Sequence, residues 1–307
     1  MFQSLLTATV LFCLLAGRLP AAPLAAGCAA VFLGAWLLRR FRPHTHDDWT
    51  SVDFHAQQSR LGGVPAGLKA LLTLGCIVLV LAAQAPAVSA FVLALAFALT
   101  VLAGGTPAGT FLRLFSVPAS FVLLSGLALL FDFTRSPGGA ISLPCFGGYL
   151  AVTAATQASA LRIMLGAAAS VACLYALCLS TPMYELIAAL GRAHLPEILI
   201  ELMYLIYRYI FVLSGTLSQM KTAAASRLGF SGSRAAMRST GRIMTSLLAS
   251  SFQKASASFD AMQSRCYAGR LRFLEQRKPI KPSHLAGSAA ILAAVSLSIF
   301  LERVWLP

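Results

Sequence analysis

Seven apolar stretches recur along this 307-residue chain, most of them near the length that a helix needs to cross a lipid bilayer. Such a helix takes about 20 mostly apolar residues, because the hydrocarbon core is about 30 Å thick. Charged residues make up only 11% of the chain, against about 25% in an ordinary soluble domain. We therefore expect an all-α, polytopic membrane protein with spans at residues 5–15, 22–38, 68–83, 87–103, 115–131, 158–179 and 285–301.

The spans divide the chain into four parts. The first stretch is short enough to resemble a signal peptide, but no basic residue precedes it and Arg18 follows it. We interpret residues 1–50 as a transmembrane hairpin whose role the sequence leaves open. Residues 51–181 then form a domain of four spans, residues 182–284 an insertion, and residues 285–307 a final span.

The basic residues gather on one side of this predicted topology. Twenty of the 24 lysines and arginines fall in residues 39–69, at Arg113 or in residues 192–281, which share a side if every span crosses once. Lysine and arginine are enriched in cytoplasmic loops of membrane proteins. We therefore expect a protein of the cell inner membrane with its N-terminus and the insertion in the cytoplasm and its C-terminus outside. The net charge of +14 then reports topology and not binding to nucleic acid.

The first half of the insertion, residues 197–227, is predicted to be one long helix. Residues 198–213 are apolar enough to pass as a further span, but Glu201 and Arg208 lie two turns apart on one face. Charges at the middle of a bilayer are costly. We interpret this helix as lying along or below the cytoplasmic membrane surface, and the sequence leaves its depth open.

The second half, residues 239–265, has the pattern of an amphipathic helix. Apolar side chains recur at spacings of three and four, which place them on one face. This predicted coupling-helix stripe comprises Met244, Leu248, Phe252 and Phe259, with Ala255 and Met262 in the same register. The polar remainder makes the helix unsuited to crossing a membrane, so the stripe needs a partner surface.

An arginine lies near the predicted end of each long helix. Arg227 is followed two residues later by Gly229, and Arg265 is followed four residues later by Gly269. Glycine after a helix end is typical of a left-handed cap. The simplest interpretation is a basic side chain that complements the negative end of the helix dipole, worth about 0.3–1 kcal/mol.

Several stretches from Asp53 to the last span resemble one family, in the same order along the chain. They are Val52-Asp53-Phe54, Pro65 with Lys69, residues 181–186, Pro196, Tyr207-Arg208-Tyr209, residues 227–230, and Ala261-Met262 with Ser264-Arg265. The sequence resembles the CbiQ-type T component of energy-coupling factor transporters, the membrane subunit of cobalt and nickel importers. The resemblance covers about 250 residues, and residues 1–50 lie outside it.

The resemblance implies a coupling role for the insertion. Its helices would transmit motion from two ATP-binding cassette ATPase subunits to a substrate-binding membrane (S) subunit, with an arginine at each of two helix ends docking into the ATPases. Carried over to this chain, the ATPase-coupling residues are Arg227, Gly229, Ala261, Met262, Arg265 and Gly269. The family motif reads Ala-Arg-Gly, whereas Ser226 and Leu228 flank the first arginine here and Ser264 and Cys266 flank the second.

The sequence offers little support for a catalytic function. The nearest match to a phosphate-binding loop, residues 215–222, has Met220 where a second glycine is needed. We expect a non-enzymatic subunit without a cofactor or resident metal, and we interpret His44, His46, Asp47 and Asp48 as a solvated loop. Alternatives are a T subunit for another solute such as a vitamin, a membrane enzyme acting on anionic lipid, and a self-sufficient carrier. The enzyme lacks a paired acid–base arrangement, and the carrier lacks paired repeats.

Overall fold

The computed structural model describes residue 53, residues 55–134, 141–145, 148–193 and 195–269, residue 278, and residues 281–305. The chain divides into two compact units: Met1–Pro182 with Lys278–Pro307, and Met183–Arg277. The predicted hairpin in residues 1–50, its two spans and the cluster of His44, His46, Asp47 and Asp48 lie outside the described residues.

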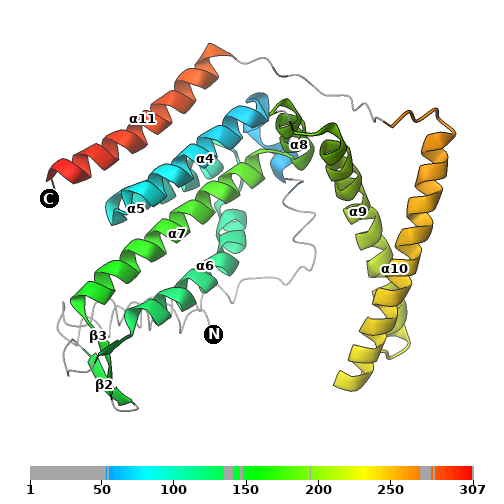
Figure 1. Ribbon diagram of the computed structural model, residues 1–307, viewed down its shortest axis with the longest axis horizontal. Helices are drawn as coiled ribbons and strands as arrows, with labels where there is room; N and C mark the ends of the chain where they lie inside the picture. Colours follow the sequence, from blue (N-terminus) through cyan, green and yellow to red (C-terminus); the bar gives the residue numbers. More distant parts are fainter. Residues whose placement is uncertain are drawn as a thin grey trace. The chain divides into compact units, whose positions relative to one another are not determined.

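The described part of unit 1 contains five long helices that match the five remaining predicted spans (Figure 1). Among the described residues, all five are long and apolar enough to cross a membrane. Helix α5 ends in a π-helical turn, Leu99–Ala103, and a short 3-10 helix, Arg60–Gly63, precedes the first span. The helices are α4 (Ala66–Ala83), α5 (Pro86–Ala98), α6 (Ala108–Leu130), α7 (Ala154–Ser180) and α11 (Pro282–Trp305). The polytopic all-α fold is confirmed.

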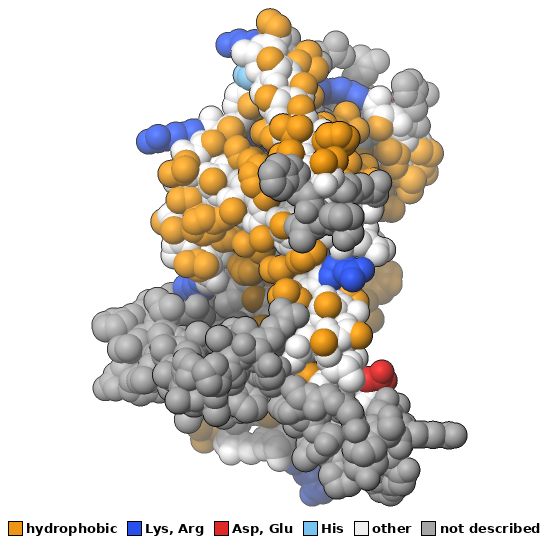
Figure 2. All heavy atoms as spheres, turned by 90° about the vertical axis from the view of Figure 1, so that its left-hand side faces the viewer, with side chains coloured by type: hydrophobic (Ala, Val, Ile, Leu, Met, Phe, Trp, Pro, Cys, Tyr) orange, Lys and Arg blue, Asp and Glu red, His pale blue; other side chains and the backbone are white. Residues whose placement is uncertain are grey.

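The core of unit 1 centres on α7. Its buried face is built from small residues, Ala169, Ala172 and Cys173, which let neighbouring helices approach closely. Val80, Val92 and Val295 of the helices around it belong to the same buried cluster. Many large apolar side chains point outward instead, and Figure 2 shows hydrophobic groups over much of the described surface. Such a surface suits lipid better than water.

A small antiparallel sheet connects α6 to α7, between two of the predicted spans. Its strands are β1 (Asp132–Thr134), β2 (Ile141–Cys145) and β3 (Gly148–Val152), with β3 between the other two. Asp132 pairs with Ala151, and Ile141 pairs with Val152. Helix α7 then starts in a capping box, in which the Thr153 side chain accepts from the amide of Thr156 and the Thr156 side chain accepts from the amide of Thr153.

Unit 2 contains α8 (Met183–Arg192), α9 (Glu197–Ser226) and α10 (Ser233–Gln263). Both long predicted helices are present. Helix α10 begins at Ser233, directly after its N-cap Gly232 and six residues before the predicted start at residue 239.

The two ends of unit 2 in the sequence connect to one end of unit 1. Ser180, just before unit 2, and Ser283, just after it, line the same cavity of unit 1. At the opposite end, Glu302 of α11 accepts a hydrogen bond from the amide of Val88 at the start of α5, at 3.3 Å. If unit 1 spans a membrane, residues 183–281 therefore cross it an even number of times or not at all. Helix α9 is long and apolar enough to cross a membrane, whereas α10 is not. A single crossing by α9 would place the two ends of residues 183–281 on opposite sides of the membrane, which is inconsistent with their connection to the same end of unit 1.

Candidate coupling surface on α9 and α10

Arg227 caps the C-terminus of α9 in a complete Schellman turn. The amide of Gly229 donates to the carbonyl of Ala224 at 2.9 Å, and the amide of Leu228 donates to the carbonyl of Ala225 at 3.0 Å. These are the two bonds that define the motif, with Arg227 at the C-cap position. The turn satisfies carbonyls that the helix end would otherwise leave unpaired. The Arg227 side chain is exposed.

Arg265 occupies the same position at the end of α10. The amide of Tyr267 donates to the carbonyl of Met262 at 3.1 Å, and the amide of Cys266 donates to the carbonyl of Gln263 at 3.0 Å. Met262 thus takes part through its backbone, while Ala261 lies exposed one residue before it. The two arginines of the predicted site therefore end their helices in the same local structure.

The left-handed residue in each turn is not the one that the sequence analysis predicted. Leu228 has φ of 53° and Cys266 has φ of 60°, and each directly follows its arginine. Gly229 is not in this region, so its assignment as the left-handed cap was wrong, and Gly269, with φ of 80°, lies three residues beyond the Cys266 cap. The left-handed conformation costs a residue with a side chain about 1–2 kcal/mol. The sequence rule failed because glycine was assumed to be required at this position.

Gly229 has a different role, since it allows two segments to approach closely. A β-carbon at this position would lie 2.8 Å from the carbonyl oxygen of Ala224 and 2.8 Å from Oγ of Ser239. The Ser239 hydroxyl also donates to the carbonyl of Gly229 at 2.9 Å, which ties the turn to the first part of α10. A glycine is therefore needed here for space and not for backbone freedom.

Helices α9 and α10 form an antiparallel hairpin joined by hydrogen bonds along its length. The Tyr209 hydroxyl donates to the carbonyl of Lys254 at 3.5 Å, and the Lys254 amine donates to Oγ1 of Thr216 at 2.6 Å. Near the other end, the Tyr267 hydroxyl donates to the Glu201 carboxylate. Because α10 is 31 residues long, Arg227 and Arg265 lie at opposite ends of the hairpin, about 45 Å apart along the helix axis.

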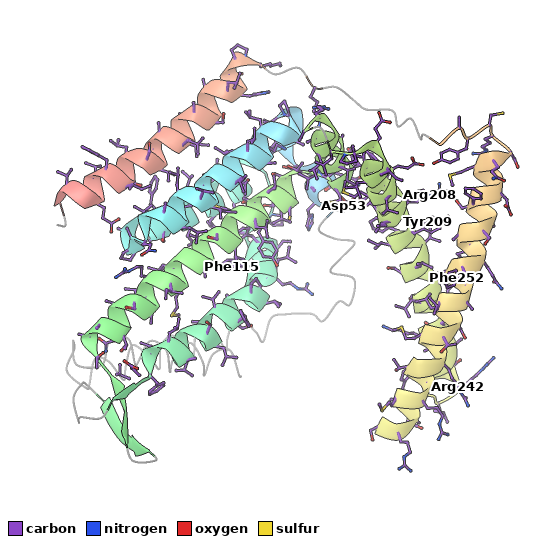
Figure 3. All side chains as sticks on the ribbon, in the orientation of Figure 1. Asp53, Phe115, Arg208, Tyr209, Arg242 and Phe252 are labelled. Carbon is purple, nitrogen blue, oxygen red and sulfur yellow. The ribbon has the colours of Figure 1, made fainter. Side chains whose placement is uncertain are left out.

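The predicted apolar stripe is exposed over its whole length. Met244, Leu248, Phe252 and Phe259 have exposed fractions of 50, 58, 68 and 47%. Figure 3 shows Phe252 and Arg242 on α10, with Arg208 and Tyr209 on α9. An uninterrupted row of large exposed apolar groups marks a surface for a protein or a membrane.

Two features of this surface were missed. Tyr267 is the partner of Glu201, and that hydrogen bond, followed by burial and the nearby carboxylate charge, raises the pKa of the Tyr267 hydroxyl. The 66 residues between the partners leave no local signal for the contact. Arg234, Arg238 and Arg242 are exposed at spacings of four on α10, and this regular spacing could have revealed a basic row on the part of the helix that precedes the apolar stripe.

Among the described residues, no group of three or more histidine, cysteine, aspartate or glutamate side chains could hold a metal ion. The predicted coupling residues thus combine charged helix ends and an apolar stripe. Exposed charged and apolar side chains of this kind can bind other proteins.

Comparison with known proteins gives relatives over most of the chain. A putative fused cobalt transport protein CbiMQ of Methanocorpusculum labreanum is 27% identical over 266 residues, covering 86% of this chain and 43% of the relative. An uncharacterized protein of Methanocaldococcus jannaschii is 37% identical over 99 residues, 32% of this chain and 37% of that protein. The chain therefore spans less than half the length of these two relatives. The cobalt transport protein CbiQ of Rhodobacter capsulatus is 28% identical over 248 residues, 80% of this chain and 97% of the relative.

A family model supports the same relationship. The model described as CbiQ, cobalt transport protein, matches residues 57–276, which include four of the five described spans and the whole α9–α10 hairpin. The match begins after the predicted N-terminal hairpin, as the resemblance in the sequence did. This multi-pass membrane protein belongs to the CbiQ family of cobalt transport proteins.

Proposed function

We propose that the chain is the membrane-embedded coupling (T) subunit of an ATP-driven energy-coupling factor importer in the cell inner membrane. The solute is cobalt or a related divalent metal. The observation that carries the proposal is the pair of exposed arginines, Arg227 and Arg265, each at the C-cap of an equivalent turn. Two similar contacts suit two copies of one kind of partner, such as paired ATPases.

Arginine is suited to such a contact. Its planar guanidinium donates several hydrogen bonds and stays charged when it is partly removed from water. Neither the Arg227 nor the Arg265 guanidinium has a hydrogen bond or an ion pair with another described residue of unit 2. Each guanidinium is therefore available to a carboxylate or a backbone carbonyl in an ATPase groove.

The hairpin between the arginines provides the path for motion. The contacts of Tyr209, Lys254 and Tyr267 fasten α9 to α10, so that a displacement at either end moves both helices together. The exposed stripe on α10 would pass that displacement to the substrate-binding membrane subunit. The name of the M. labreanum relative describes a fusion of cobalt transport proteins, which favours a membrane partner of this kind.

The orientation follows from the charges. With the insertion in the cytoplasm, Arg227 and Arg265 face the compartment that holds ATP, and the C-terminus lies outside. We place α9 at the cytoplasmic membrane surface. If α9 crossed the membrane, a second helix would have to cross back to reach the same end of unit 1, and α10 is too polar to do so.

Uptake of radioactive cobalt by cells that express the chain with its partner subunits tests this function. We expect Arg227→Ala and Arg265→Ala each to reduce uptake and copurification of the ATPases, and the double variant to reduce both further. Lys221→Ala removes an exposed basic side chain inside α9, more than one turn before the end of that helix, and is the matched control. Membrane levels of all variants should be equal, because the side chains are exposed.

Full cobalt uptake in the double variant would contradict the coupling role. A transporter that takes up a vitamin and not cobalt, but still needs both arginines, would retain that role and change only the solute.

A further inference from the structure

A cavity of about 300 Å³ lies within unit 1, among α4, α5, α7 and α11. Most of its wall is apolar, with Leu72, Cys76, Leu95, Cys173 and Ile291 among the lining residues. It belongs to the membrane-spanning part of the chain and is separate from the coupling residues on α9 and α10.

The polar lining of the cavity is concentrated at one end. On α4, Lys69 lies about two turns before Cys76, and on α7, Ser180 lies about two turns after Cys173. On α11, Ser283 and His284 occupy the first turn, about two turns before Ile291. The cavity is therefore amphipathic along its length, with a polar end where the chain leaves and re-enters unit 1.

Lys69 and His284 provide the basic side chains at this polar end of the cavity. Lys69 is only 7% exposed, and its amine donates to the carbonyl of Ser180 at 2.8 Å. Nδ1 of His284 is completely buried and has no hydrogen-bond partner among the described residues. Buried polar atoms normally have a partner, so the unpaired nitrogen of this cavity-lining residue is a candidate donor for a ligand group.

Positive charge prevails around that group. Lys281 immediately precedes α11, and the N-terminal end of a helix carries partial positive charge. Among the described residues that line the cavity, none is an aspartate or a glutamate. A ligand with an anionic oxygen at one end and a hydrocarbon chain at the other would match both parts of the cavity.

We propose that this cavity binds one anionic phospholipid from the surrounding bilayer. An acyl chain occupies the apolar part, and a phosphate oxygen accepts a hydrogen bond from His284 near the charge of Lys69. The proposal depends on the membrane location of unit 1 and does not depend on coupling to ATPases. Loss of cobalt uptake in the arginine variants would neither support nor weaken it.

Native mass spectrometry of the full-length chain, delipidated in mild detergent, tests the proposal. Phosphatidylglycerol and phosphatidylcholine are added back separately and the bound lipid is counted. We expect one phosphatidylglycerol per chain, held about tenfold more strongly than phosphatidylcholine, because the choline cation offsets the phosphate charge that both headgroups carry.

Two variants locate the binding. Gly287 lines the cavity, and a β-carbon there would meet no atom within 4 Å, so Gly287→Leu fills the cavity without a backbone clash. Gly109→Leu on α6 is the matched control, since it also has open space but lies outside the cavity. We expect Gly287→Leu to lose about tenfold in retained phosphatidylglycerol, as does His284→Leu, and Gly109→Leu to bind like the unmodified chain.

Equal retention of phosphatidylglycerol by Gly287→Leu and the unmodified chain would overturn the site. Equal retention of the two lipids by the unmodified chain would overturn the anionic headgroup.

Discussion

Leu228 and Cys266 have the same left-handed backbone conformation, and each directly follows an arginine that ends a long helix. Both positions correspond to the glycine of the Ala-Arg-Gly motif in the family that the sequence resembles. The chain thus keeps the turn while replacing the residue that adopts it most easily. The geometry around Arg227 and Arg265 is retained at a cost in stability.

Replacing either residue by glycine should therefore stabilise the protein. We expect Leu228→Gly and Cys266→Gly each to raise the free energy of unfolding by about 1 kcal/mol, the lower part of the penalty for a left-handed side chain. Leu248→Gly is the control, because Leu248 lies inside α10, where glycine should cost roughly 1 kcal/mol. Denaturant unfolding in detergent distinguishes these outcomes, and destabilisation by Leu228→Gly would show that the turn is held by the leucine side chain.

A substitution at Gly229, two residues after Arg227, should instead lower the free energy of unfolding. Gly229→Ala places a methyl group against Ala224 and Ser239, so the turn must open and the hydrogen bond from Ser239 must weaken. We expect a loss of about 1–3 kcal/mol, typical of overpacking a tight site. Gly215→Ala on α9 has open space at its β-carbon and should be neutral or stabilising. Hydrogen exchange at residues 224–239 would report the loosened turn directly.

The sequence predicted most of this architecture because hydrophobic periodicity is a local property. The five described spans and the stripe from Met244 to Phe259 follow from residues within a few turns of one another. The β-sheet between α6 and α7 was missed, since its strands have three to five residues and β2 contains Pro144. Segments this short carry too little alternation to identify a strand.

Contacts between residues far apart in the chain could not be predicted from the sequence either. In the sequence, Glu201 served only as a charge that disfavours a membrane span, and the antiparallel arrangement of α9 and α10 brings Tyr267 to its carboxylate. The positions of Arg227 and Arg265 were predicted, whereas their separation to opposite ends of one hairpin required the structure. The cap residues differed because local backbone strain at Leu228 and Cys266 is offset by hydrogen bonds that a sequence pattern does not reveal.

Cys266 provides a direct test of orientation, since it is exposed and lies beside Arg265. We expect a membrane-impermeant maleimide to label it in inside-out vesicles and not in right-side-out vesicles. Cys266→Ser should abolish labelling in inside-out vesicles, because Cys76, Cys173 and Cys178 lie within spans of unit 1. Cys145 lies in β2, which this topology places on the other side of the membrane. In a background that carries both Cys145→Ser and Cys266→Ser, Asp132→Cys, at the sheet beyond α6, should show the reverse pattern. Labelling of Cys266 from outside the cell would contradict the cytoplasmic placement of the coupling surface.

The hydrogen bond from Lys69 to Ser180 should contribute measurably to the stability of unit 1. It joins the first turn of α4 to the last carbonyl of α7, and the positive amine lies at the negative end of the α7 dipole. Lys69→Met keeps most of the side-chain volume but leaves that carbonyl with one bond fewer in a buried place, which should cost about 1–3 kcal/mol. Lys281→Met removes an exposed lysine just before α11 and should change the free energy of unfolding by less than about 0.5 kcal/mol. Equal stability of the two variants in denaturant would mean that the end of α7 is held by packing alone.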